Sequence, residues 1–178
     1  WPDDTYDEFV ASLEGIGPKQ SETLYTYGFA SLAFLRAHSS DWNSLAELPQ
    51  ITELFNHYMN ISGDEVNGAV YTYMGIMLTL RPPALGGEPE RAREYFEKAI
   101  ALAHRWLAMD DLNEEAHRAL MRLYLGMGDR SAAIRQYDQC VNKLKTELGI
   151  PPQEETTALY QAILSGDIKT TPISPPIN

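Results

Sequence analysis

The sequence has little that would build a disulfide-linked, membrane-spanning or strand-based structure. Cys140 is its one cysteine, so no disulfide can form within the chain. The longest apolar run, MGIMLTL at residues 74–80, is far shorter than the ~20 residues that cross a bilayer. The period-two alternation of apolar and polar residues that marks strands is weak throughout. These absences exclude a disulfide scaffold, predict no membrane span and argue against a sheet.

Basic residues are scarce in the first half of the chain. Residues 1–87 hold three Lys or Arg against eleven Asp or Glu, whereas residues 88–178 hold eleven against fourteen, and the net charge is −11. Such an acidic surface repels nucleic acid and anionic membranes, so we expect neither as a partner. The change in composition near residue 88 indicates a composite origin.

What the sequence does have is helical periodicity, almost without interruption. Apolar spacing, capping residues and Gly or Pro breakers predict about eight helices joined by short turns. Pro49 is expected to kink its helix or to separate a first turn from it. The predicted helices are 4–13, 21–37, 42–60, 66–80, 90–108, 113–126, 129–148 and 154–164, and an extended C-terminal tail covers 168–178.

One contact pattern recurs in two of these helices, 41 residues apart. A small, an aromatic and a small residue stand at i, i+4 and i+7, in the sets Ala92, Phe96, Ala99 and Ala133, Tyr137, Cys140. Small residues let a partner helix approach, and the ring fills the space between them. The neighbouring helix offers a complementary apolar face, formed by Ala116, Leu120, Leu123, Tyr124 and Met127. The sequence predicts an all-α, tetratricopeptide-like stack of about four helical hairpins in a right-handed superhelical array.

The segment LRPPALGGEPERAREYFEKAI, residues 80–100, joins a Pro pair and a Gly pair to the Ala–Phe–Ala helix. With the helices before it, over about residues 5–103, it resembles the T component of tripartite ATP-independent periplasmic (TRAP) transporters, a helical, tetratricopeptide-like family. The resemblance implies a periplasmic or lipid-anchored helper that docks a solute-binding partner and passes an apolar ligand. No signal-peptide pattern is visible and the chain opens at Trp1. We therefore expect a cytoplasmic location as expressed, with a periplasmic origin open for this segment.

From about residue 101 the sequence resembles a second family. The stretches LNEEAHRALMRLY, AAIRQYDQC and LKTELGIPPQEETTALY are similar to the bacterial transcriptional activator domain of antibiotic-pathway regulators. In that family the domain packs or dimerises beside a separate DNA reader, so the resemblance implies a dimerisation module and no DNA binding. Three parts follow: 1–103 as transporter-like repeats, 104–167 as activator-like repeats, and 168–178 as the tail.

The two resemblances meet inside one predicted helix, residues 90–108. A crossover there would keep the shared contact pattern, which favours an engineered chimera of tetratricopeptide-like segments. The alternative is a natural interaction module, either transporter-associated or regulatory. An imperfect graft predicts a cavity or mobility near Trp106 and Met109, where the two cores are expected to meet.

No residue pattern indicates an enzyme, a metal site or a cofactor. Glu53 and His57 have the i, i+4 spacing of ligands, but no second pair accompanies them, so we expect a surface ion pair. Cys140 occupies a small position of a packed helix, which predicts a buried, inert thiol. The turn from Gly15 to Lys19 resembles a helix-hairpin-helix element, yet its acidic surroundings would repel phosphate and favour a plain loop. PPALGG, residues 82–87, lacks the Lys and the preceding strand of a phosphate loop.

The predicted function is therefore binding. Tyrosines at helical spacing are mostly core residues, whereas others suit a groove that accepts a peptide, a protein or an apolar ligand. Arginines of the C-terminal part form a local basic face that suits an acidic partner, with solvated salt bridges as the alternative. The oligomeric state stays open. The candidate partner surface comprises Tyr25, Tyr71, Tyr73, Arg118 and Arg122.

Overall fold

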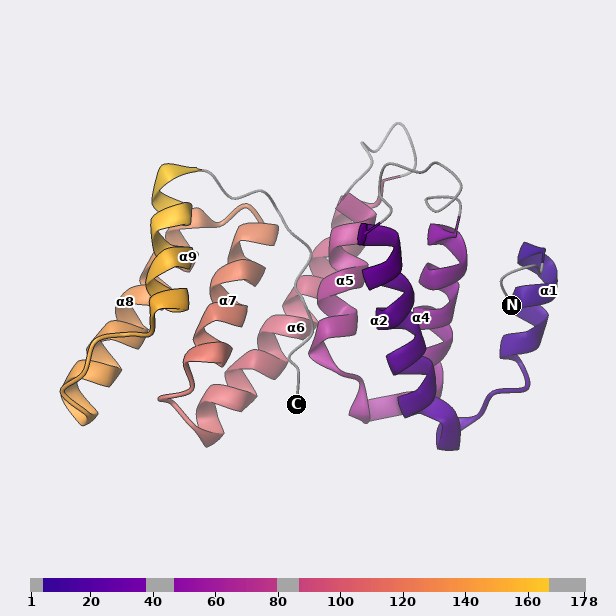
Figure 1. Cartoon of the computed structure of the whole chain (residues 1–178), viewed down its shortest axis with the longest axis horizontal. Coiled ribbons are helices and arrows are strands. Elements are labelled where there is room, and N and C mark those ends of the chain that lie inside the picture. Colours follow the sequence, from indigo (N-terminus) through magenta and orange to yellow (C-terminus); the bar gives the residue numbers. More distant parts are fainter. Residues whose placement is uncertain (1–4, 38–46, 80–86, 167–178) are drawn as a thin grey trace. The chain divides into compact units, whose positions relative to one another are not determined.

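The computed structural model describes residues 5–37, 47–79 and 87–166, and throughout these ranges the regular structure is helical, without a strand (Figure 1). The predicted all-α class is confirmed. The chain divides into two compact units, residues 1–67 and residues 68–176. The boundary near residue 103 rests on sequence resemblance and lies inside a single helix, so the three-part division stays a prediction. The same holds for the right-handed superhelical array, and the tail 168–178 lies outside the described residues.

The described part of the first unit holds the α-helices α1 (Tyr6–Leu13), α2 (Ser21–Ala37) and α4 (Leu48–Ser62) and the short 3-10 helices η1 (Pro18–Gln20) and η2 (Gly63–Glu65). A reciprocal cap starts α1, because the Thr5 hydroxyl accepts from the Glu8 N–H at 3.4 Å and the Thr5 N–H donates to the Glu8 carboxylate at 2.9 Å. Pro49 lies in the first turn of α4, where its missing N–H leaves no partner unsatisfied. The predicted kink within that helix is therefore not observed, and residues 42–46 of it lie outside the described ranges.

The core of the first unit forms where α2 and α1 pack on α4. Gly28 of α2 lies so close to α4 that a Cβ placed on it would stand 2.7 Å from the Phe55 ring. The turn between α1 and α2 is tied to the same helix, since the His57 Nε2 lies 2.8 Å from the Ile16 carbonyl oxygen. His57 therefore contacts a backbone carbonyl, and the Glu53 carboxylate accepts from Asn56 at 3.1 Å. These contacts replace the ion pair that was expected between Glu53 and His57.

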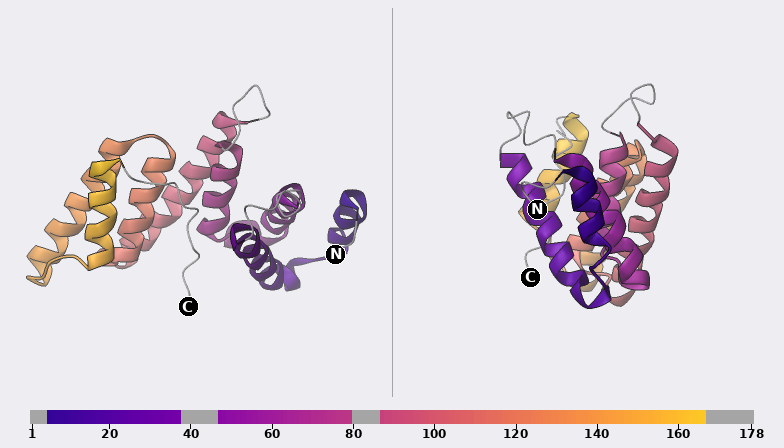
Figure 2. Two further views of the ribbon diagram at one scale, coloured as in Figure 1. Left: turned by 45° about the horizontal axis from the view of Figure 1, so that its top comes forward. Right: turned by 90° about the vertical axis from the view of Figure 1, so that its right-hand side faces the viewer.

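The described part of the second unit contains five helices: α5 (Gly68–Thr79), α6 (Pro89–Met109), α7 (Glu114–Gly126), α8 (Arg130–Glu147) and α9 (Glu154–Ser165). Each packs on the next along the chain, and α7 also touches α5 and α9 (Figures 1 and 2). The helix starts and the helix end predicted for this part of the sequence are confirmed. Asn113 and Asp129 cap α7 and α8 with their side chains, and Gly149 follows α8 with a φ of 69°.

The repeated contact pattern lies in the core, as predicted. Ala92, Phe96 and Ala99 of α6 are each at most 3% exposed. The Phe96 ring contacts a glycine on either neighbouring helix, Gly75 of α5 and Gly126 of α7. Ala133 and Cys140 of α8 are fully buried, and Tyr137 is partly buried against a second cluster with Met121 and Ile163.

Trp106 and Met109 do not mark a meeting of two cores. They are 41% and 86% exposed, so both lie at the surface of α6. The core passes instead along the opposite face of this helix, where Ala103 shares one cluster with Leu120 of α7. The expectation that these residues line a joint between cores is therefore wrong, because apolar character alone does not show which face of a helix is covered.

Candidate binding surfaces

Tyr25, in the first unit, belongs to an aromatic cluster between α2 and α4. Its ring centroid lies 4.8 Å from that of Phe29 and 5.7 Å from that of Tyr58. Burial raises the pKa of Tyr25, and the neighbouring Tyr58 adds to this shift. The Tyr58 hydroxyl in turn accepts from the Asn67 N–H at 3.2 Å. Tyr25 therefore holds two helices together through ring contacts, and it acts in part as a core residue.

Tyr71 of α5 stacks on Tyr95 of α6, with ring centroids 6.1 Å apart and an interplanar angle of 26°. The Lys98 ammonium lies 5.5 Å from the Tyr71 centroid and 5.6 Å from the Tyr95 centroid, within the range of cation–π attraction. Arg91 approaches the Tyr95 ring at 5.8 Å. We name these four residues the tyrosine–cation surface. It presents two exposed cations beside a half-buried ring.

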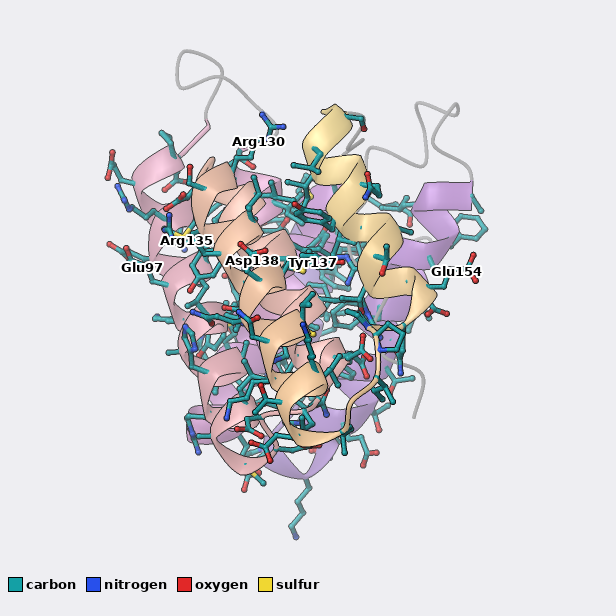
Figure 3. The ribbon with its side chains drawn as sticks, turned by 90° about the vertical axis from the view of Figure 1, so that its left-hand side faces the viewer. Glu97, Arg130, Arg135, Tyr137, Asp138 and Glu154 are labelled. Carbon is teal, nitrogen blue, oxygen red and sulfur yellow. The ribbon has the colours of Figure 1, made fainter. Side chains whose placement is uncertain are left out.

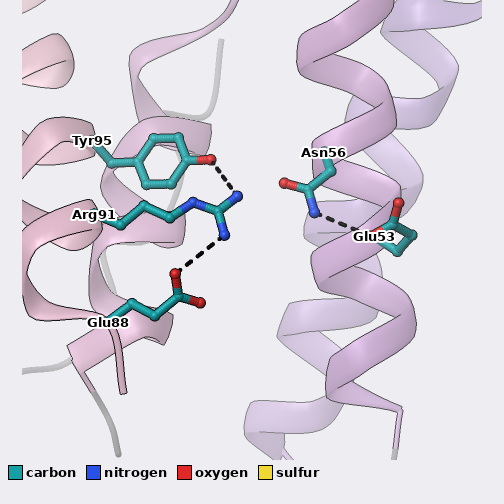
Figure 4. A network of polar contacts seen from close by, with 5 residues as sticks. All are labelled: Glu53, Asn56, Glu88, Arg91 and Tyr95. Atoms are coloured by element: carbon teal, nitrogen blue, oxygen red, sulfur yellow. Dashed lines mark hydrogen bonds and ion pairs between the residues drawn. The ribbon is translucent and has the colours of Figure 1, made fainter. Parts of the chain in front are cut away.

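A short polar chain runs along the start of α6 at this surface (Figure 4). Arg91 donates to the Tyr95 hydroxyl and pairs with Glu88, each at 3.5 Å. The hydrogen bond and charge of Tyr95 raise the pKa of Arg91, with a smaller contribution from Glu88. The long distances and the exposure of both ionic groups make this a weak pair. It orients the guanidinium along the helix without removing it from solvent.

Tyr73, two residues from Tyr71, has a different environment. It is only 6% exposed, and burial raises the pKa of its hydroxyl well above the ordinary value. Its place in the candidate partner surface stays a prediction. The Tyr73 side chain itself lies in the core. Helical geometry explains the contrast, because residues two apart project about 200° from one another.

A buried polar network that sequence reasoning missed joins α7 to the start of α9. Glu114 is 8% exposed and accepts from the Gln153 N–H at 2.9 Å and from the Thr156 hydroxyl at 2.7 Å. Its carboxylate thus caps α9, where the helix dipole favours a negative charge. Arg118 completes the network by donating one Nη1 to Gln153 Oε1 at 2.9 Å and to Thr156 Oγ1 at 2.8 Å. Acids in the first turn of α7 are an expected local signal, but their partner 42 residues away is not.

Arg118 and Arg122 stand one turn apart on α7, yet their surroundings differ. Arg118 is held by α9, whereas Arg122 makes no hydrogen bond or ion pair with any residue in the described ranges. Burial lowers the pKa of Arg122, and the like charge of Arg118 lowers it further, while Glu115 acts in the opposite direction. The half-buried Arg122 side chain is therefore held by packing rather than by a polar contact with the described residues.

The arginines predicted to form one basic face make separate contacts. Arg130, at the start of α8, donates to the carbonyl oxygens of Ile163 and Leu164 at 3.1 and 2.8 Å, at the end of α9. Figure 3 shows Arg130 near one end of the helices and Glu154, the first residue of α9, well away from it. Arg135 is exposed. Arg118 and Arg130 therefore secure opposite ends of α9.

A shallow depression of about 460 Å³ lies at the other end of the second unit. It is lined by residues of α6, the α6–α7 turn, α7 and α8: Leu107, Asp111, His117, Gln139, Asn142, Lys143, Thr146 and Glu147. Lys143 pairs with Asp111 across it; this contact raises the pKa of Lys143 and lowers that of Asp111. His117 forms its floor, with Nε2 3.2 Å from the Asp111 carbonyl oxygen and Nδ1 2.7 Å from the Gln136 side-chain nitrogen. These contacts leave little free chemistry in the depression.

The groups that could carry chemistry are engaged or buried. His104 lies 3.2 Å from the Tyr124 hydroxyl, and no cluster of three or more potential metal ligands occurs among the residues that the structure describes. Burial raises the pKa of Cys140 to about 11, so its thiol stays protonated at neutral pH. In the glycine turn, the Gly17 N–H donates to Gln20 at 3.2 Å, which occupies one of the amides that a phosphate would need.

Two family models match the chain. The model of the TRAP transporter T-component matches residues 2–121, and that of the bacterial transcriptional activator domain matches residues 84–164. The matches overlap over residues 84–121, a range that includes all of α6. No curated protein and no solved structure matches the chain. Across the described ranges, no helix has the length and apolarity that a bilayer crossing requires.

Proposed function

The chain belongs to the TRAP transporter T-component family, and from this membership we propose that it is a non-enzymatic binding module whose partner is a protein of a solute transporter. The observation that carries the proposal is the tyrosine–cation surface on α5 and α6, which lies within the matched residues. Tyr and Arg are, with Trp, the side chains enriched at the energetic centres of protein interfaces. Two cations over stacked rings suit an acidic or carbonyl-rich partner surface.

The absence of catalysis is part of the proposal. Support comes from the three histidines described above, which contact backbone or side-chain partners, and from Cys140, whose thiol is fully buried. A general base or nucleophile needs access to its substrate and a matched pKa. The described residues offer no convergent set of this kind.

A natural origin is the form of the proposal that we favour. The T-component match runs beyond residue 103 and the activator-domain match begins before it, which supports a helical pattern common to the two families. One continuous core along α6 and α7 is consistent with this. An engineered chimera is the alternative. Finding the uninterrupted coding sequence at a genomic locus would end that alternative, and its absence beside two separate source genes would support it.

Binding to the solute-binding protein of the same transporter tests the proposal. Isothermal titration of the two purified proteins should give a saturable complex that Tyr71→Ala or Lys98→Ala weakens by about 30-fold, the scale of an interface hot spot. Lys145→Ala, which removes an exposed cation from α8, is the matched control and should bind as the parent chain does. Failure of the parent chain to bind would refute the proposal.

Native mass spectrometry of the parent chain separates the remaining alternatives. A retained lipid or other apolar molecule would support apolar-ligand binding in place of protein docking. A stable dimer would instead favour a dimerisation role, as the activator-domain resemblance implies. A bare monomer together with a measured complex is the result that the proposal predicts.

A further inference from the structure

Met109, the last residue of α6, is far more accessible than any other methionine of the chain. All six methionines lie within the described ranges, and Met109 is 86% exposed. Met74 and Met121 are at most 1% exposed, and the remaining three are half-buried: Met59, Met77 and Met127. The thioether of Met109 is therefore the one that a reagent in solution can reach without any opening of the fold.

The unequal lengths of α5 and α6 explain this exposure. Gly68, the first residue of α5, lies against Leu102 of α6, because a Cβ built on Gly68 would stand 3.6 Å from Leu102 Cδ1. Met109 follows Leu102 by two turns, so it lies on the same face of α6. It stands about 10 Å further along the helix axis, beyond the first residue of α5. The neighbouring helix therefore does not cover it.

Trp106 lies on this face as well, one turn after Leu102 and one turn before Met109. It is 41% exposed. We name Trp106 and Met109 the α6 end patch. Both side chains present apolar surface to solvent, but only the thioether changes from apolar to polar in one chemical step, by oxidation to the sulfoxide.

We propose that Met109 is a site of reversible oxidation by hydroperoxides, and that this modification converts the α6 end patch from an apolar to a polar surface. The thioether sulfur attacks one peroxide oxygen, so that an S–O bond forms as the O–O bond breaks. Sulfur loses two electrons, and the peroxide gains them. The hydroxyl proton of the peroxide passes to the departing oxygen, which leaves as water or an alcohol. A methionine sulfoxide reductase, with a thiol as reductant, reverses the step.

The modification should leave the fold intact. The Met109 side chain is almost as exposed in the folded chain as in an unfolded one, so an added oxygen is solvated in both states. An oxygen on Met74 or Met121 would instead be buried in the core, where an unsatisfied polar group is costly. The urea midpoint of a chain oxidised at Met109 alone should equal that of the parent chain. A clearly lower midpoint would show a structural role for Met109 and overturn the proposal.

Peptide mapping by mass spectrometry, after brief treatment with dilute hydrogen peroxide, tests the selectivity. Met109 should be oxidised at least about tenfold faster than Met74 or Met121, because those two react only when the core opens. In urea this difference should disappear. Two methionine sulfoxide reductases, one for each sulfoxide epimer, should restore the parent mass when supplied with dithiothreitol. Equal rates in the folded chain, or a Met109 sulfoxide that resists both reductases, would contradict the proposal.

Hydrophobic interaction chromatography tests the change in the surface. The chain oxidised at Met109 should elute earlier than the parent chain, and Met109→Gln should elute early without peroxide. Met109→Leu is the matched control, because it keeps an apolar side chain without a sulfur atom; it should elute with the parent and stay there after the same treatment. An unchanged elution of the oxidised parent, or an equal shift of Met109→Leu, would refute the proposal. The patch lies at the end of α6, apart from the tyrosine–cation surface, so these outcomes do not depend on the function proposed above.

Discussion

The ring of Phe96 lies against the backbone of Gly75 so closely that no side chain fits between them. A Cβ built on Gly75 would stand 2.7 Å from Phe96 Cε1, and the ring also lies against Gly126, where a Cβ would stand 3.0 Å from Phe96 Cζ. Phe96 is only 2% exposed, so the ring has no open space into which it could move. The spacing of three successive helices thus depends on one aromatic side chain between two glycines.

Gly75→Ala should destabilise the second unit. Alanine favours helix by about 1 kcal/mol over glycine, but overpacking of a confined ring costs roughly 1–3 kcal/mol. We expect a net loss of about 1 kcal/mol in the free energy of unfolding, measured by urea denaturation with far-UV circular dichroism. Gly68→Ala is the control, because its Cβ would meet Leu102 at an ordinary 3.6 Å. Equal stability of the two variants would contradict the conclusion that the Phe96 ring leaves no space for a side chain at Gly75.

Thr156→Val should loosen α9. The substitution keeps the shape of a fully buried residue but removes the hydroxyl that donates to Glu114 and accepts from Arg118. Losing a partner of a buried charged group costs about 1–3 kcal/mol. Hydrogen exchange of the α9 amides should therefore accelerate by about tenfold or more, while Thr156→Ser should exchange as the parent chain does. Unchanged protection in the valine variant would mean that the network adds nothing to stability.

Cys140 should be unreactive in the folded chain. Because burial raises its pKa to about 11 from an ordinary value of 9.0, the folded thiol remains protonated at pH values where an unfolded thiol ionises. Stability contributed by this group is complete below pH 9 and falls as pH rises from there towards 11. At pH 8, a thiol reagent such as dithiobis-nitrobenzoate should react only after urea is added. Fast labelling of the native chain would contradict the buried position.

Removing a helix cap should have a smaller and local effect. The Asp129 side chain accepts from the Ala132 N–H at 2.8 Å at the start of α8. Asp129→Ala should lower the free energy of unfolding by about 1 kcal/mol, whereas Asp129→Asn, which keeps an acceptor, should lose much less. Urea midpoints of the three proteins test this order, and an alanine variant as stable as the parent would refute the cap.

Local signals let the sequence predict most helix boundaries. The predicted helix 21–37 coincides with α2, and Asn113 and Asp129 cap the helices that they were predicted to cap or begin. Capping, glycine and proline effects act within a few residues, so they can be seen in the sequence itself. The division after Asn67 could not be predicted, because it depends on which helices pack together.

The roles of the candidate surface residues could be predicted from the sequence less well than the helix boundaries. In the sequence, Arg118 and Arg122 are equivalent residues on one helical face, and only the placement of Gln153 and Thr156 distinguishes a bonded arginine from an unpaired one. Tyr71 and Tyr73 likewise look alike until the packing of α6 is known. Contacts between residues that are far apart in the chain decide these roles, and a single sequence does not reveal them.

The contacts at the two ends of α9 have a consequence for how this helix moves. Its first turn is bound by Glu114 and Arg118 of α7, and its last carbonyl groups are bound by Arg130 of α8. Fraying from either terminus is thereby suppressed, so the helix has no easy stepwise route off its neighbours. It should detach in a single concerted event or not at all.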